Sequence, residues 1–276
     1  MIDNWFLQIS AWFVSVFGII SNTCAIIYNI KSLNVKYNCN NDFVSTFLLI
    51  NLGIGDLMMN IYLLFIAYKD SKSRHTFGES AISWQNSFTC SLAGFLSVLA
   101  CLSTACFLAF ITFERFYVIK YSCYNKRISV KIAITVALLI WSLSTFGASL
   151  PFFKINSYSS YAICLPFDTR TETNKFYIIS MNILLVFCFT FICICYLSIL
   201  LNTVLLKKKS SLNSCNTIAQ MKMRHAEVQK LVRNISVLVL VNKNLNILLI
   251  LLCYTGIIEN RLFILSNYYT KNQPRD

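Results

Sequence analysis

The sequence predicts an all-α fold, a polytopic bundle of membrane helices. The chain has 276 residues, is 57% hydrophobic with a mean hydropathy of +0.61, and has only 13% charged residues, whereas soluble domains hold about 25%. Its apolar residues form runs that reach the roughly 20 residues needed to cross a bilayer. The runs do not alternate with period two, and a backbone inside lipid must satisfy its own hydrogen bonds, so each is expected to be a helix.

Five apolar runs are expected to span the membrane. In chain order they are Trp5–Ile30, Phe43–Tyr68, Phe88–Phe113, Ile132–Phe153 and Phe176–Leu206. The first run is too long for the apolar part of a signal peptide, and no Lys or Arg precedes it. A sixth run is interrupted by Asn242, Lys243 and Asn244. It is either one helix with a lysine near its middle, which costs about 2.5–3.5 kcal/mol, or a short re-entrant or interfacial segment.

The distribution of positive charge predicts the side of the membrane that each loop faces. The net charge is +13. With the N-terminus outside, the inner loops hold more than twice as many Lys and Arg residues as the outer loops, which is the positive-inside pattern. Because these residues flank the spans, anionic lipid of the inner leaflet accounts for them and nucleic-acid binding is not expected.

Two of the 12 cysteines differ from the others in their predicted location. Most lie within the spans or in inner loops, where thiols stay reduced. Cys90 and Cys164 fall on the outer side by the charge distribution. Two outer thiols indicate one disulfide, which would join the start of the third span to the loop after the fourth, and two free thiols are the alternative.

Several polar residues lie at membrane depth or at the ends of spans. Asp56, in "NLGIGDLMMNIYLL", is an ionisable residue deep in the second span, which indicates a functional site. Asn22 and Thr104 are polar residues inside the first and third spans. Glu114 and Arg115 close the third span on the predicted inner side, and apolar residues continue after them.

Together these motifs resemble those of rhodopsin-like G-protein-coupled receptors, most closely the leucine-rich-repeat-containing branch of glycoprotein-hormone and relaxin receptors. "INLGIGDLMMNIYLLFIAYKD" resembles that branch's second helix, "ISWQNSFTCSLAGF" its first outer loop and "YAICLPFD" its second outer loop. "FERF" stands where the family has Asp/Glu-Arg-Tyr, and its distance of 25 residues from Cys90 to Arg115 matches the family spacing. The resemblance covers residues 5–239 and implies a rhodopsin-like arrangement of the helices.

The resemblance implies a coupling role for the charged pair. In the family this arginine pairs with its neighbouring acid, and often with an acid at the foot of the sixth helix. By position these residues are Arg115, Glu114 and Glu227. Such a pair is a two-state element that breaks when the bundle opens and the arginine meets the G protein. The alternative is that Arg115 is a membrane-edge anchor.

The resemblance also implies a sodium site at Asp56, with Asn22 and Thr104 supplying further oxygens, the ligands that hard cations prefer. A protonated, hydrogen-bonded Asp56 in a packed core is an equal alternative. Structural roles are expected for three aromatic residues, Trp84, Trp141 and Tyr196. An interfacial position is the alternative for Tyr196.

The C-terminal part of the sequence departs from the family pattern. The sixth-helix motif Cys-Trp-x-Pro and the seventh-helix motif Asn-Pro-x-x-Tyr are absent, and no leucine-rich repeats precede Trp5. We therefore expect a receptor transmembrane domain over residues 1–241 and a divergent segment over residues 242–276. A truncated receptor, a mis-joined gene model and a pseudoreceptor are the alternatives.

The expected function is that of a plasma-membrane receptor with its N-terminus outside. It would transmit a signal from an unknown peptide or protein-hormone ligand to a heterotrimeric G protein, in contact with membrane lipid and with no cofactor beyond a sodium ion. One alternative is a small ion transporter or channel subunit with Asp56 on the ion path, although the hydropathy shows no internal repeat. Another is a non-signalling fragment that associates with full-length receptors. Enzyme activity is not expected, since the sequence has no nucleophile–base pair or phosphate-binding loop.

Overall fold

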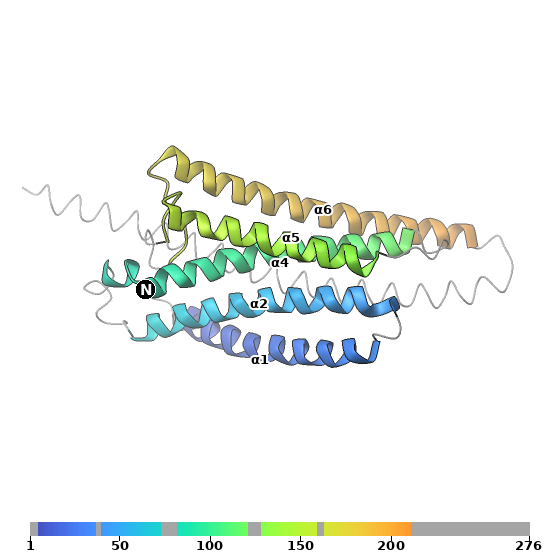
Figure 1. Cartoon of the computed structure of the whole chain (residues 1–276), viewed down its shortest axis with the longest axis horizontal. Helices are drawn as coiled ribbons and strands as arrows, with labels where there is room; N and C mark the ends of the chain where they lie inside the picture. Colours follow the sequence, from blue (N-terminus) through green and yellow to red (C-terminus); the bar gives the residue numbers. More distant parts are fainter. Residues whose placement is uncertain (1–4, 37–39, 73–81, 121–127, 159–162, 211–276) are drawn as a thin grey trace, which may run out of the picture. The chain divides into compact units, whose positions relative to one another are not determined.

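The computed structural model describes residues 5–36, 40–72, 82–120, 128–158 and 163–210. Its main elements are the helices α1 (Trp5–Lys36), α2 (Asn40–Lys72), α4 (Phe88–Lys120), α5 (Val130–Ser149) and α6 (Glu172–Ser210), with the 3₁₀ helix η2 (Leu150–Phe153) after α5 (Figure 1). The described residues contain no strand, and the predicted all-α class is confirmed. The chain divides into two compact units, Met1–Asn202 and Thr203–Asp276, and the helix packing lies in the first.

The five predicted membrane spans are confirmed. Stretches long and apolar enough to cross a membrane run over Gln8–Leu33, Phe43–Lys72, Phe88–Val118, Val130–Phe153 and Glu172–Ile199. The third span does not end at Glu114, because α4 continues to Lys120 and carries the charged pair within a helix. The interrupted sixth run and the segment 242–276 lie outside the described residues, so their interpretation and the boundary at residue 241 stay predictions.

Helices α2 and α4 form the centre of the packing. α1 packs along α2, α2 along α4 and α4 along α5 (Figure 1). α2 and α4 bury about half of their spans inside the protein, whereas α1 and α6 bury a small share. Large apolar side chains such as Phe13 and Val186 are therefore exposed, as expected for helices that face lipid.

A core of buried side chains joins α2, α4 and α5 near the C-terminal end of α4. Leu48 of α2 and Phe107 of α4 are fully buried there, and Ala133 and Ala137 supply the surface of α5. Without a hydrophobic driving force between helices in lipid, small residues at an interface stabilise the pair by letting the backbones approach closely. Pro151 marks the other end of α5, since it has no backbone N–H to continue the helix.

Gly94 of α4 provides a test of how closely the loop between η2 and α6 packs. A Cβ atom at Gly94 would lie 2.1 Å from the carbonyl oxygen of Cys164 and 2.3 Å from Cδ1 of Tyr158. The Gly94→Ala variant should therefore destabilise the protein by about 1–3 kcal/mol, the usual cost of overpacking, and lower its unfolding temperature in detergent.

The matched control for that substitution is Gly53→Ala in α2. A Cβ there would meet only the flexible side chain of Ile26, at 3.1 Å. Alanine favours a helix over glycine by up to about 1 kcal/mol, so Gly53→Ala should unfold at or above the temperature of the unaltered chain. Equal unfolding temperatures for the two variants would contradict the close approach of the loop to Gly94.

Candidate functional site

The charged pair at the C-terminal end of α4 is tied to α2. Arg115 Nε lies 3.3 Å from Oε2 of Glu114, and the Glu114 side chain is largely buried. Ser45 of α2 donates its hydroxyl hydrogen bond to Oε1 of Glu114 over 3.1 Å. One carboxylate therefore joins two helices and fixes a guanidinium. Sequence patterns gave no signal for Ser45, because its partner lies 69 positions away.

Tyr196 of α6 lies next to this pair. Its buried hydroxyl is close to Thr112 and Arg115 but makes no hydrogen bond within the described part of the chain. The Thr112 hydroxyl instead donates to the carbonyl of Leu108 over 2.7 Å. Tyr196 therefore brings α6 close to the charged pair of α4.

Asp56 lies in α2 at a close approach of α2 to α4. A Cβ on its neighbour Gly55 would lie 2.6 Å from Cγ2 of Thr104 and 3.2 Å from Oγ of Ser103, so both hydroxyl-bearing residues lie beside this part of α2. The Thr104 hydroxyl donates to the carbonyl of Ala100 over 2.8 Å, and Ser103 bonds to the same carbonyl over 3.1 Å.

Asn22 of α1 is the other residue predicted to supply an oxygen at Asp56. Its amide nitrogen donates to the carbonyl of Gly18 over 3.0 Å, which leaves its side-chain oxygen as the possible ligand. Asn60 also belongs to this polar region, since its amide donates to the backbone carbonyl of Asp56 over 2.7 Å. Carboxylate, hydroxyl and amide oxygens are the ligands that a hard cation such as sodium prefers, and the sodium site at Asp56 stays a prediction.

Trp141 of α5 is held against α2 and α4. Its indole Nε1 donates to Oδ1 of Asn51 over 2.9 Å, and its ring packs against Phe107 with centroids 5.7 Å apart. The residue therefore combines packing with a hydrogen bond across two helices. The sequence predicted the packing position but not the partner Asn51.

The predicted disulfide between Cys90 and Cys164 is confirmed. It joins the start of α4 to the loop between η2 and α6. The same loop is held by Tyr62 of α2, whose hydroxyl donates to the carbonyl of Ile163 over 2.9 Å. Thus α2 holds Ile163 and α4 holds Cys164, which are adjacent residues of this loop.

A buried asparagine organises the remainder of that loop. Asn156 donates from its side chain to the carbonyl oxygens of Asp168 and Asn174, and its side-chain oxygen accepts from the backbone of Ser157 and Asp168. Its positive φ of 86° is tolerated by asparagine better than by most residues. The loop is consequently bound to the start of α6 as well.

Tyr158 connects the loop to α5. Its hydroxyl donates to the carbonyl of Ala148 over 2.6 Å. Burial, with a smaller contribution from Tyr177, raises the pKa of the Tyr158 phenol above its usual range, so the donor form persists at all physiological pH values. The Tyr158 and Asn156 contacts were not predicted, because nothing in the local sequence distinguishes them from ordinary loop residues.

The remaining predicted site residues are either placed elsewhere or not described. Trp84 is buried in the segment between α2 and α4, with Lys69 Nζ 5.1 Å from its ring centroid. Glu227, the predicted sixth-helix partner of Arg115, lies outside the described residues, so that contact stays a prediction.

Comparisons with known proteins give a consistent result. The family described as "7 transmembrane receptor (rhodopsin family)" matches residues 21–258. The follicle-stimulating hormone receptor of Cairina moschata is 34% identical over 194 residues, and the lutropin-choriogonadotropic hormone receptor of Sus scrofa is 33% identical over 195 residues. Each alignment covers 70% of this chain but 27% of the relative, so the chain spans about a quarter of these receptors' length.

Among solved structures, squid rhodopsin has a similar fold. The TM-score is 0.56 at 18% sequence identity, and the match covers 76% of this chain and 60% of the rhodopsin chain. The described helices therefore follow the rhodopsin-like arrangement expected from the motifs.

Proposed function

This chain belongs to the rhodopsin family of seven-transmembrane receptors, and we propose that it transmits a peptide- or protein-hormone signal to a heterotrimeric G protein at the plasma membrane. The hormone class is inferred from the names of the similar glycoprotein-hormone receptors. The observation that carries the coupling proposal is the largely buried Glu114 carboxylate, which pairs with the partly exposed Arg115 and is anchored to α2 by Ser45. Family membership does not favour the transporter alternative, and it agrees with a non-enzymatic role.

The proposed orientation places the N-terminus outside the cell. Disulfides form and persist in oxidising compartments, so the end of the bundle with Cys90 and Cys164 is assigned to the outside. Gln8, near the start of α1, bonds to Asp70 at the end of α2, and α4 begins at that same end. This assignment agrees with the distribution of Lys and Arg and puts Arg115 on the inner side.

In the proposed mechanism the ligand acts on the loop between η2 and α6. This loop is connected to α2 through Tyr62, to α4 through Cys90 and to α5 through Tyr158. A ligand that shifts the loop therefore biases the positions of several helices. The inner response is separation of Arg115 from Glu114, which frees the guanidinium for the G protein, a coupling of two distinct sites.

We propose that the carboxylate of Asp56 would hold a sodium ion inside the bundle, where the ion would supply a neutralising positive charge. Oxygens of Asn22, Ser103 and Thr104 would complete the site with it. Asn60 holds the backbone at this residue in place.

The sodium proposal predicts salt-specific stability. At the same ionic strength, the unaltered chain should unfold at a temperature a few degrees higher in sodium chloride than in potassium chloride, because a ligand of the folded state stabilises it by about 1–3 kcal/mol at 10–100 times its Kd. Asp56→Asn should remove this difference. If both proteins unfold alike in the two salts, the alternative of a protonated, hydrogen-bonded Asp56 is supported instead.

The coupling proposal is tested by nucleotide exchange on purified heterotrimeric G proteins, with the full chain in lipid nanodiscs. Glu114→Gln keeps an acceptor for Ser45 but removes the charge that holds Arg115. We expect the basal exchange rate to rise about fivefold, which corresponds to about 1 kcal/mol for a partly exposed ion pair.

A matched control for this substitution is Glu172→Gln, at an exposed carboxylate that pairs with Lys175 near the start of α6. It should leave exchange at the level of the unaltered chain. Exchange that stays at the level of empty nanodiscs for the unaltered chain and for Glu114→Gln, with every G-protein class, would contradict the proposed function.

A further inference from the structure

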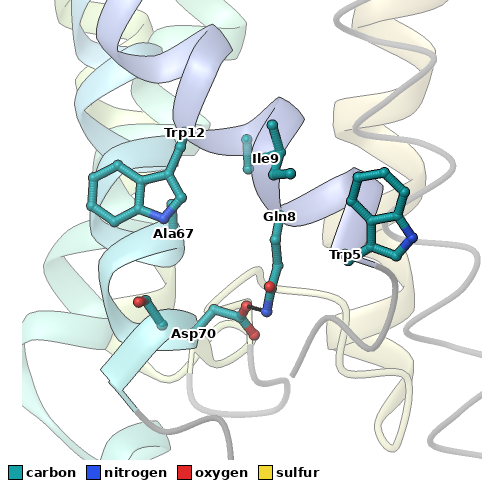
Figure 2. Close-up of a pocket in the computed structure, with 8 residues that line it drawn as sticks. Trp5, Gln8, Ile9, Trp12, Ala67 and Asp70 are labelled. Atoms are coloured by element: carbon teal, nitrogen blue, oxygen red, sulfur yellow. Dashed lines mark hydrogen bonds between the residues drawn. The ribbon is translucent and has the colours of Figure 1, made fainter.

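Helices α1 and α6 bury the smallest shares of their spans, and each is held near its start by a hydrogen bond to a neighbouring helix. Gln8 of α1 donates to the carboxylate of Asp70 in α2 (Figure 2). Tyr177 of α6 donates its hydroxyl hydrogen bond to the carbonyl of Gly147 in α5 over 3.2 Å. Farther along α6, apolar and sulfur-containing side chains make the contact with α4, and two of these side chains can react with each other.

Two contacts show that α4 and α6 run side by side in the same direction. Leu102 of α4 and Met181 of α6 meet at Gly147 of α5, because a Cβ atom there would lie 3.1 Å from Cδ1 of Leu102 and 3.0 Å from Cε of Met181. Later in both helices, the rings of Phe113 and Phe191 pack with their centroids 6.4 Å apart. The side chains of α4 and α6 between these two contacts therefore share one interface.

Two free cysteines, Cys106 of α4 and Cys188 of α6, lie in that part of the interface, and their thiol groups interact directly. Both lie near the middle of their spans. Cys188 is buried, whereas Cys106 is partly exposed and packs against the core formed by α2, α4 and α5. We propose that this pair is an oxidation site, at which a lipid hydroperoxide closes a disulfide that fixes α6 against α4.

The oxidation proceeds in two steps. The sulfur of Cys106, the more accessible thiol, takes the terminal peroxide oxygen, so the O–O bond breaks and a sulfenic acid and a lipid alcohol form. The sulfur of Cys188 then attacks the sulfenic sulfur, the S–S bond forms, the S–O bond breaks, and the hydroxyl leaves with the thiol proton as water. The peroxide gains two electrons, one from each thiol. Thiols in apolar surroundings react slowly, so the bond should accumulate under sustained lipid peroxidation.

The test exposes the full chain in lipid nanodiscs to cumene hydroperoxide, an apolar organic hydroperoxide. The remaining thiols are blocked with N-ethylmaleimide, and the chain is digested without reduction so that mass spectrometry identifies the linked peptides. We expect a Cys106–Cys188 linkage in addition to the Cys90–Cys164 disulfide. Oxidation should also raise the unfolding temperature by several degrees, because a new disulfide constrains the unfolded chain.

Single-thiol variants make this test specific. Cys106→Ala and Cys188→Ala should each lose the linkage and the rise in unfolding temperature, and either variant decides the outcome if the other does not fold. Cys195→Ala is the matched control, because it removes another buried thiol of α6, and it should respond as the unaltered chain does. The proposal is overturned if the oxidised chain lacks the Cys106–Cys188 linkage, or if Cys106 links equally often to other thiols. Neither readout uses a G protein, so the result is independent of the proposed signalling.

Discussion

Replacing Arg115 by alanine should reduce receptor-dependent nucleotide exchange at least about tenfold, to the level of empty nanodiscs. A guanidinium presents five N–H donors, and charge-assisted hydrogen bonds are about twice as strong as neutral ones. Alanine supplies no donor, so the interaction with the G protein is lost rather than weakened. The measurement is the exchange rate of the Glu114→Gln protein with and without the additional Arg115→Ala substitution.

This pair of variants also separates signalling from folding. Arg115→Ala alone leaves Glu114 buried without its cation, which costs stability, whereas the double variant has no such charge. Lys120→Ala is the control for loss of a cation from the same end of α4, where Lys120 lies over the Phe116 ring, and it should exchange normally. If the double variant exchanges as fast as Glu114→Gln alone, Arg115 is a membrane-edge anchor with no coupling role.

The helices could be predicted from the sequence because lipid removes most alternatives. An apolar run of sufficient length in a bilayer can only be a helix or part of a closed barrel, and runs without period-two alternation leave the helix. No knowledge of the contacts between helices was needed to assign these segments as helices. The pairing of Cys90 with Cys164 followed from topology, since the charge distribution left these two thiols on the oxidising side.

The polar contacts between helices could not be predicted in the same way. Ser45 and Glu114 meet because α2 and α4 pack in a particular register, and a shift of one residue along either helix would turn one side chain away. Hydropathy fixes which segments are helices but not their rotation or register. The same reason explains why Asn51 was missed as the partner of Trp141, and why Gly94 gave no sign that a loop backbone would rest on it.

Removing the disulfide should have the largest effect on stability. With Cys90 and Cys164 both replaced by serine, we expect the free energy of unfolding to fall by about 2–4 kcal/mol. The bond closes a loop with a sequence separation of 74, and part of that loop is α5, which stays helical in lipid after unfolding. The unfolded chain is thus already constrained, so the loss should lie at the lower end of this range. The unfolding temperature in nanodiscs measures the change.

The control variant Cys24→Ser replaces an exposed free thiol and should unfold with the unaltered chain. Reduction of the unaltered chain with dithiothreitol should lower its unfolding temperature to that of the double variant, on which dithiothreitol should have no effect.

The loop should nevertheless remain on the bundle, because the contacts of Tyr62 and Asn156 do not involve the disulfide. Adding Tyr62→Phe to the double variant should therefore cost more than adding it to the unaltered chain, since Tyr62 and Cys164 hold adjacent parts of one loop and their contributions are coupled. If Tyr62→Phe lowers the free energy of unfolding equally in the two backgrounds, the disulfide and the Tyr62 hydrogen bond act independently. The proposal that the loop links α2 and α4 as one unit would then be contradicted.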